Sequence, residues 1–122
     1  MKKKLKIRER MFNMFPDNVW AIRGYAWSLH CRGKLELNNN EDEAQKWFSK
    51  AEAVRLKGEY KYPEDLGIKE DLFDNYIDFI KHFGLKDEVK PNYWINFIRE
   101  REGNSPRVIR LEKKLKEALS NN

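Results

Sequence analysis

Cysteine, histidine and glycine are scarce in this chain of 122 residues. The sequence contains one cysteine, two histidines and six glycines. A single cysteine excludes a disulfide within the chain and any zinc site built from several thiolates. We expect Cys31 to be a small buried apolar residue, and a reactive thiol is the less favoured alternative.

Sequence motifs for catalysis and cofactor binding are also missing. There is no glycine-rich phosphate loop and no H-E-x-x-H zinc pattern. His30 and His82 stand far apart without a partner motif, and a lone histidine on a helix is more often a surface or core residue than a base. We therefore predict a non-enzymatic protein with no catalytic residue, no cofactor and no metal.

Long apolar runs are absent as well. No segment approaches the roughly 18 apolar residues that a membrane span requires. The lysine-rich start of the sequence is not followed by the apolar core of a secretory signal. These absences predict a cytoplasmic protein without a membrane partner.

Aromatic and charged residues are abundant. Seven Phe, five Tyr and four Trp accompany a charged fraction of 37%. Aromatic side chains on this scale supply the apolar surface that disordered segments lack. A chain of this length can bury a core of its own, so we expect one folded domain with a charged exterior.

Apolar residues recur at helical spacing along most of the chain, and no segment alternates in the manner of a strand. The pattern predicts an all-α fold, a compact irregular bundle of five to six helices. Its expected parts, all within one domain of residues 1–122, are a basic N-terminal helix at 1–15, a helical hairpin at 17–57, a loop at 58–68 and C-terminal helices at 69–119.

Proline, asparagine and glycine mark the expected helix ends. A helix seldom continues through the residue before proline, whereas Asn and Asp cap helix starts and Gly follows helix ends. The second and third helices are expected to stop at Gly33 and Gly58. The expected caps and remaining breaks are Pro16, Asp17 or Asn18, Asn40, Gly84, Gly103, and Ser105 with Pro106.

Both ends of the chain are basic around an acidic centre. Residues 1–10 carry a net charge of +5, residues 61–100 a net −3 and residues 101–122 a net +3. The basic ends could contact the phosphates of a nucleic acid, solubilise the protein, or fold against its own acidic helix. The candidate nucleic-acid-binding residues are Lys2, Lys3, Lys4, Lys6, Arg8, Arg10, Arg107, Arg110, Lys113 and Lys114.

Three carboxylates share one face of the expected fourth helix. Asp71, Asp74 and Asp78 stand at spacings of three and four, within reach of a common cation. Metal sites of this kind usually recruit further ligands from other helices, and no such pairing is visible. A solvated acidic face, or a dock for Arg and Lys of the termini, is the favoured interpretation.

Small and aromatic residues recur at matching spacings in the second and third helices. The two triplets are Trp20, Gly24 and Trp27, and then Ala44, Phe48 and Ala51. Residues 17–56 thereby resemble a single degenerate tetratricopeptide repeat, in which small residues let two antiparallel helices approach. The expected turn at residues 32–40 is longer than in that family, and Leu56 stands where the family usually has proline.

Gly24 is the small residue of the first triplet. In this resemblance it faces the neighbouring helix of the hairpin. Replacing Gly24 by Leu is therefore expected to wedge the pair apart and to cost about 1–3 kcal/mol by overpacking.

The resemblance implies a scaffolding role, because such helices usually present a groove to a peptide or a partner helix. Exposed aromatic side chains would serve as anchors, although each could instead be a core residue. We predict a protein-interaction module, an adaptor or small regulator, that binds a protein partner through an aromatic helical surface. The alternative is a nucleic-acid-associated accessory protein, and self-association is left open. The candidate anchors are Tyr25, Trp27, Trp47 and Trp94.

Overall fold

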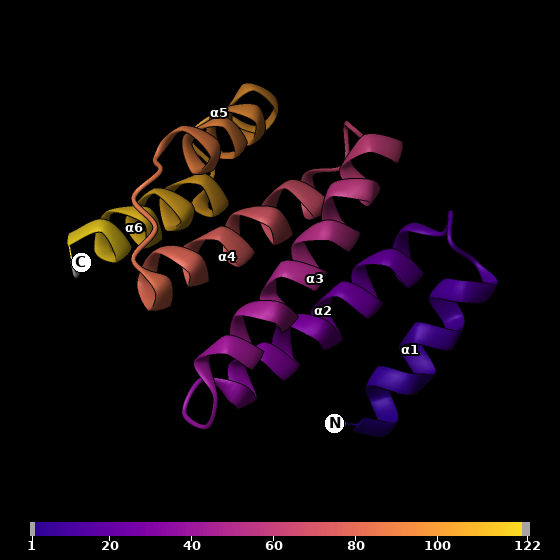
Figure 1. The fold of residues 1–122 in the computed structure, drawn as a ribbon. Coiled ribbons are helices and arrows are strands. Elements are labelled where there is room, and N and C mark those ends of the chain that lie inside the picture. Colours follow the sequence, from indigo (N-terminus) through magenta and orange to yellow (C-terminus); the bar gives the residue numbers. More distant parts are fainter. Residues whose placement is uncertain (1, 121–122) are drawn as a thin grey trace. The chain divides into compact units, whose positions relative to one another are not determined.

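The computed structural model describes residues 2–120, with side chains from residue 4 onward. Over this range it contains six α-helices and no β-strand, which confirms the predicted all-α fold (Figure 1). No helix in the described range is long and apolar enough to cross a membrane. The helices are α1 (Lys2–Met14), α2 (Val19–Glu36), α3 (Glu41–Lys61), α4 (Leu66–Phe83), α5 (Val89–Glu102) and α6 (Pro106–Ser120).

The chain divides into two compact units. The N-terminal unit is Met1–Ile68 and contains α1, α2 and α3. The C-terminal unit is Lys69–Asn122 and contains most of α4 together with α5 and α6. Each unit has helices of its own, and each is described separately below.

Within the N-terminal unit, α2 and α3 form a closely packed hairpin (Figure 1). Small residues allow this approach, because a Cβ added to Gly33 would lie 2.9 Å from two ring atoms of Phe48. A Cβ added to Gly58 would lie equally close to Ile22. The apolar core of the hairpin consists of Ile22, Ala26, Leu29, Ala44, Phe48 and Ala51.

Gly33 and Gly58 do not end helices, so the sequence prediction was wrong at both positions. α2 continues through Gly33 to Glu36, and α3 continues through Gly58 to Lys61. Both glycines lie at close contacts that leave no room for a side chain, which explains their place inside helices. The connections are correspondingly shorter than the predicted 32–40 and 58–68, and they cover residues 37–40 and 62–65.

The predicted asparagine caps are confirmed. The Asn18 side chain accepts hydrogen bonds from the backbone N–H groups of Trp20 and Ala21, at 2.9 and 3.0 Å. The Asn40 side chain accepts one from Glu43 at 3.1 Å. Each cap supplies a partner for N–H groups that the first helical turn leaves unpaired.

α1 lies along α2. The Phe12 and Tyr25 rings stack with centroids 5.1 Å apart, and the Tyr25 hydroxyl donates to Glu9 at 3.1 Å. The nearest atoms to a Cβ added at Gly24 belong to Arg8 of α1, at 3.9 and 4.0 Å. Gly24 therefore faces α1 across an ordinary contact distance, and the prediction that it faces the neighbouring helix of the hairpin, α3, was wrong.

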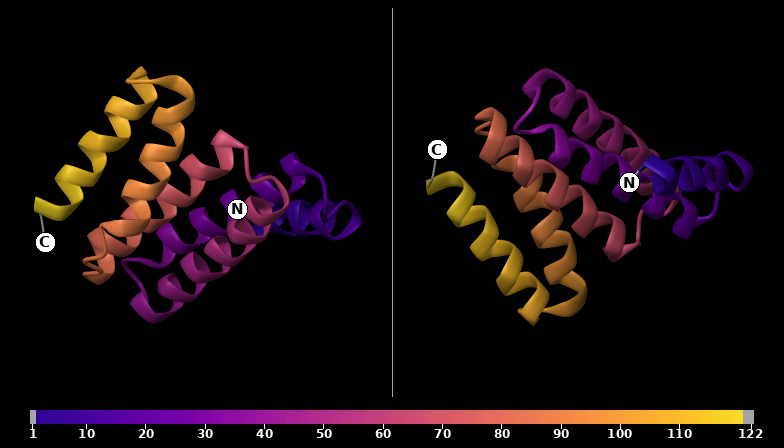
Figure 2. Two further views of the ribbon diagram at one scale, coloured as in Figure 1. Left: turned by 90° about the horizontal axis from the view of Figure 1, so that it is seen from above. Right: turned by 90° about the horizontal axis from the view of Figure 1, so that it is seen from below.

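In the C-terminal unit, α5 and α6 form a second hairpin, seen as the orange and yellow helices of Figure 2. Gly103 ends α5 with a φ of 68°, a conformation that favours glycine. The Ser105 hydroxyl accepts from the N–H of Val108 at 3.3 Å, and α6 begins at Pro106. The break at Gly103 and the cap at Ser105 are both as predicted.

α4 is more deeply buried than its sequence pattern indicated. Apolar residues of α4 such as Leu72, Phe73 and Ile80 are fully buried. Asn75 and Asp78 are buried as well, with Asp78 only 7% exposed. The predicted solvated acidic face therefore does not extend to Asp78.

Candidate functional site

The four predicted aromatic anchors do not form one exposed surface. Trp94 is 3% exposed and its ring packs edge-on against Tyr76, with centroids 5.6 Å apart. It is a core residue of the C-terminal unit, so its predicted role as an exposed anchor was wrong. Trp47 is half-buried beneath two cations, Arg32 at 5.5 Å and Lys50 at 5.2 Å from its ring centroid.

The other two predicted anchors lie on α2. Tyr25 is half-buried against α1, and its burial, reinforced by the bond to Glu9, raises the pKa of its hydroxyl. Trp27 is 48% exposed, and its ring lies 5.8 Å from that of His30. Of the four, Trp27 is thus the one with about half of its side chain open to solvent.

A groove between α1 and α2 presents a different set of residues. Its volume is about 460 Å³. Three large apolar side chains in its lining are exposed: Met11 at 47%, Phe15 at 50% and Trp20 at 72%. We call this the α1–α2 groove, and it is lined by Arg8, Met11, Phe15, Asn18, Trp20, Ala21 and Gly24.

The floor of the α1–α2 groove is fixed by contacts between the two helices. Arg8 reaches across from α1, and its Nη1 donates to the Ser28 hydroxyl at 2.9 Å and to the Gly24 carbonyl at 3.5 Å. Ala21 and Gly24 have small or no side chains, which leaves the space above them open. The groove is therefore a consequence of small residues on α2 facing long residues on α1.

Exposed apolar side chains continue from the groove along α1. Ile7 is 58% exposed and Met14 is 62% exposed. Together with Met11 they stand at spacings of four and three, which places all three on one face of α1. An apolar row of this kind, continuous with a groove, is unlike the scattered single hydrophobes normal on protein surfaces.

Positive charge surrounds this apolar row. Lys4 and Arg10 are exposed and stand three residues before and three after Ile7, so they border the same face of α1. Residues 1–36 contain nine Lys and Arg against three Asp and Glu, a net charge of +6. The remaining 86 residues carry 16 basic and 17 acidic groups, a net charge of −1. The excess positive charge of the chain thus resides in the segment that builds the groove.

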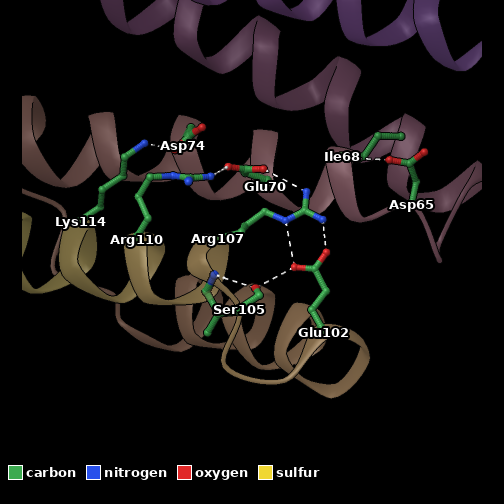
Figure 3. A network of polar contacts seen from close by, with 10 residues as sticks. Asp65, Ile68, Glu70, Asp74, Glu102, Ser105, Arg107, Arg110 and Lys114 are labelled. Atoms are coloured by element: carbon green, nitrogen blue, oxygen red, sulfur yellow. Dashed lines mark hydrogen bonds and ion pairs between the residues drawn. The ribbon is translucent and has the colours of Figure 1, made fainter.

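Three basic residues of α6, Arg107, Arg110 and Lys114, are arranged differently, because they contact carboxylates of their own unit (Figure 3). Arg107 bonds to Glu102 through Nε at 3.2 Å and through Nη2, and to Glu70 through Nη1 at 3.2 Å. Arg110 donates to Glu70 at 3.1 Å. The Arg107 and Ser105 hydrogen bonds lower the pKa of Glu102.

Lys114 completes this network by donating to Asp74 at 3.3 Å. The predicted docking of C-terminal cations on the acidic helix is therefore confirmed for Asp74, and Glu70 contributes a site that the sequence analysis missed. Burial raises the pKa of Asp74, and the attraction of Lys114 opposes that effect. Three of the four predicted phosphate-binding residues of α6 thus contact carboxylates of the protein itself.

The remaining predicted nucleic-acid residues lie mainly on α1. Lys4, Lys6 and Arg10 are exposed there, as is Lys113 on α6. Arg8 is half-buried by its bonds to α2. The side chains of Lys2 and Lys3 fall outside the described residues.

No group of three or more His, Cys, Asp or Glu suited to a metal ion occurs in the part of the chain that the structure describes. His82 lies 3.6 Å from Asp78, a single-turn pairing within α4. His30 is 1% exposed, and its Nδ1 lies 2.8 Å from Arg55 Nη1. A guanidinium can only donate, so Nδ1 of His30 accepts this hydrogen bond within the core. Cys31 is half-buried, less than predicted.

The α1–α2 groove was not predicted, because the sequence pattern of the first helix does not show which of its apolar residues are covered by a neighbour. The residues in fact divide into two rows, since Phe12 packs on Tyr25 whereas Met11 and Ile7 remain exposed. The signal in the sequence was the second row, Ile7, Met11 and Met14, at spacings of four and three. Among the described residues, α2 is the helix that packs against α1. Comparison of the chain with models of protein families, with curated proteins and with solved structures gave no match.

Proposed function

We propose that this protein is a non-enzymatic protein-interaction module, of the adaptor or small-regulator type, and that the α1–α2 groove is its binding site. The observation that carries the proposal is the cluster of Met11, Phe15 and Trp20 around one groove, each about half or more exposed. Tryptophan is among the residues most enriched at binding hot spots, and methionine adapts its shape to varied partners.

The chemistry of the groove also supports binding over catalysis. Among the described residues that line the groove, Arg8 is the one ionisable residue, and its guanidinium donates to Ser28 and Gly24. A general acid or base needs a group that titrates near neutral pH, and arginine remains protonated. The groove thus offers apolar contact and fixed positive charge.

Selection from a displayed random-peptide library tests this proposal without assuming a ligand. Peptides enriched on the wild-type protein should lose binding to Trp20→Ala, because the substitution removes the largest exposed ring of the groove. Tyr60→Ala is the matched control, since Tyr60 is 91% exposed on α3 of the same unit. Enriched peptides that bind Trp20→Ala as well as wild type would contradict the proposal, as would failure to enrich any peptide.

A second candidate is a nucleic-acid-associated accessory function. The exposed cations Lys4, Lys6 and Arg10 on α1 favour it, whereas the contacts of Arg107, Arg110 and Lys114 with Glu70, Glu102 and Asp74 disfavour a role for α6. Binding of this kind would fall steeply with added salt as counterions are released. Titration of a labelled oligonucleotide at two salt concentrations measures it directly.

A further inference from the structure

We propose that the partner of the α1–α2 groove is an amphipathic α-helix of another protein, with acidic residues on both sides of its apolar stripe. The inference rests on the proposed function and specifies the secondary structure and charge of the occupant. Three features of the described residues of the N-terminal unit carry it: the exposed apolar row, the absence of a sheet edge, and the flanking positive charge.

The apolar row has the form that a partner helix requires. Ile7, Met11 and Met14 repeat at helical spacing over two turns, or roughly 10 Å of α1. Rows at this spacing form the ridges that interdigitate with a second helix. Phe15 and Trp20 extend the row into the groove, where aromatic rings provide the largest contact areas.

The backbone of the partner must satisfy its own hydrogen bonds. An extended peptide usually gains affinity by adding a strand to an exposed sheet edge. The described residues contain no strand, so the N-terminal unit has no such edge to extend. A helix pairs its own N–H and C=O groups and needs only side-chain contacts, which is what the groove supplies.

The flanking charges select acidic residues on that helix. Lys4 and Arg10 border the apolar row, and Arg8 lies in the groove lining. Glu9 is the single acidic residue of α1, and its carboxylate accepts a hydrogen bond from the Tyr25 hydroxyl. A helix with Asp or Glu beside its apolar stripe would therefore meet complementary charges on α1.

Two other occupants fit less well. Bases of a single-stranded nucleic acid could stack on Phe15 and Trp20, but the aliphatic row of Ile7, Met11 and Met14 gains most from contact with apolar side chains. A second copy of the chain would place the same positively charged face against itself in a symmetric dimer, which brings like charges together.

Two designed peptides test the inference. Both are about 16 residues long, since shorter isolated helices are marginal in water, and both carry a Leu stripe at helical spacing. One has Glu beside the stripe and the other has Lys at the same positions. Fluorescence anisotropy of labelled peptides should show the Glu peptide binding about 10-fold or more tightly than the Lys peptide, with an affinity that falls as salt is added.

Variants locate the binding site. Trp20→Ala should weaken the Glu peptide by about 10-fold or more, and Tyr60→Ala should leave its affinity unchanged. Lys4→Glu combined with Arg10→Glu should abolish the preference for Glu over Lys. Lys46→Glu combined with Lys57→Glu changes the net charge equally on exposed positions of α3 and should preserve the preference.

Equal or tighter binding of the Lys peptide would overturn the inference. So would tighter binding of a labelled single-stranded oligonucleotide that depends on Trp20, or a dimer in sedimentation that Trp20→Ala dissociates. Library-selected peptides that bind through Trp20 but contain no acidic residue would also overturn it, while the proposed protein-binding function would stand. If no peptide lost affinity on the Trp20→Ala substitution, both the inference and the proposed protein-binding function would be contradicted.

Discussion

The N-terminal helix α1 and the C-terminal helix α6 are both basic and amphipathic, yet the structure uses their charges differently. In the C-terminal unit, Arg107, Arg110 and Lys114 of α6 contact carboxylates of the same unit. In the N-terminal unit, Lys4 and Arg10 of α1 are exposed beside an apolar row. A basic helix in a sequence can thus contact carboxylates of its own fold or leave its charges exposed, and the difference lies in whether acidic residues of the fold stand opposite.

The aromatic residues follow the same division. Trp94 of α5 is 3% exposed, whereas Trp20 of α2 is 72% exposed. One ring fills a core and the other borders a groove. Substitutions in the two units should therefore differ in their effect on stability.

Trp94→Ala should produce the largest loss of stability, about 3–5 kcal/mol, because it empties a buried ring site beside Tyr76. Trp20→Ala should change the free energy of unfolding by less than about 0.5 kcal/mol, since its ring is mostly in water. Urea unfolding followed by circular dichroism measures both. Similar losses for the two variants would show that Trp20 is a packing residue and would remove the contrast.

Gly33→Ala should destabilise the protein by about 1–2 kcal/mol, because overpacking against Phe48 outweighs the higher helix propensity of alanine. The added Cβ would lie 2.9 Å from a ring that is fully buried. Gly24→Ala is the matched control on the same helix, and it should stabilise by about 0.5–1 kcal/mol since only Arg8 lies near. Thermal unfolding of the two variants measures the difference. If Gly24→Ala lowered the melting temperature more than Gly33→Ala did, the packing described for α2 would be contradicted.

Arg107→Ala should lower the urea midpoint of unfolding, because Glu70 and Glu102 lose a shared cation. Arg10→Ala, a matched removal of one guanidinium from α1, should change the free energy of unfolding by less than about 0.5 kcal/mol and so leave the midpoint nearly unchanged. An equal effect of the two substitutions would mean that the α1 cations also stabilise the fold.

Acidification should weaken the α6 network through Glu102. Hydrogen bonds from Arg107 and Ser105 lower the pKa of Glu102. Its contribution to the free energy of unfolding is therefore fully present above the ordinary glutamate pKa near 4.3, and it is lost as the pH falls through the lowered pKa. The drop in urea midpoint between pH 6 and pH 3 should therefore be smaller for Glu102→Gln than for wild type. A larger drop for Glu102→Gln than for wild type would contradict the prediction, because it would mean that ionised Glu102 does not stabilise the fold.

Local sequence signals predicted much of the fold. Asn18, Asn40 and Ser105 cap helices as expected, because a cap depends on a few neighbouring residues. The predicted helix ends at Gly33 and Gly58 were wrong, because a glycine can mark either a helix end or a close contact between helices. Only the structure shows Phe48 and Ile22 lying against them.

The candidate site was less predictable than the fold. Tyr25, Trp27, Trp47 and Trp94 were selected by side-chain type, and sequence alone does not state whether an aromatic ring is covered. Trp20 was visible in the sequence as the first member of a helical triplet, but its exposure depends on how α1 lies along α2. The tetratricopeptide resemblance of residues 17–56 stays a prediction.

The most direct test of the contrast between α1 and α6 uses the four tryptophans as reporters within one experiment. Each indole N–H gives its own signal in a ¹H–¹⁵N spectrum, and Ala substitutions assign Trp20, Trp27, Trp47 and Trp94. Titration with the acidic helical peptide should shift the Trp20 indole and the backbone signals of α1, while Trp94 and the backbone signals of α6 stay in place. A shift of Trp94 or of α6 with Trp20 unmoved would contradict the account.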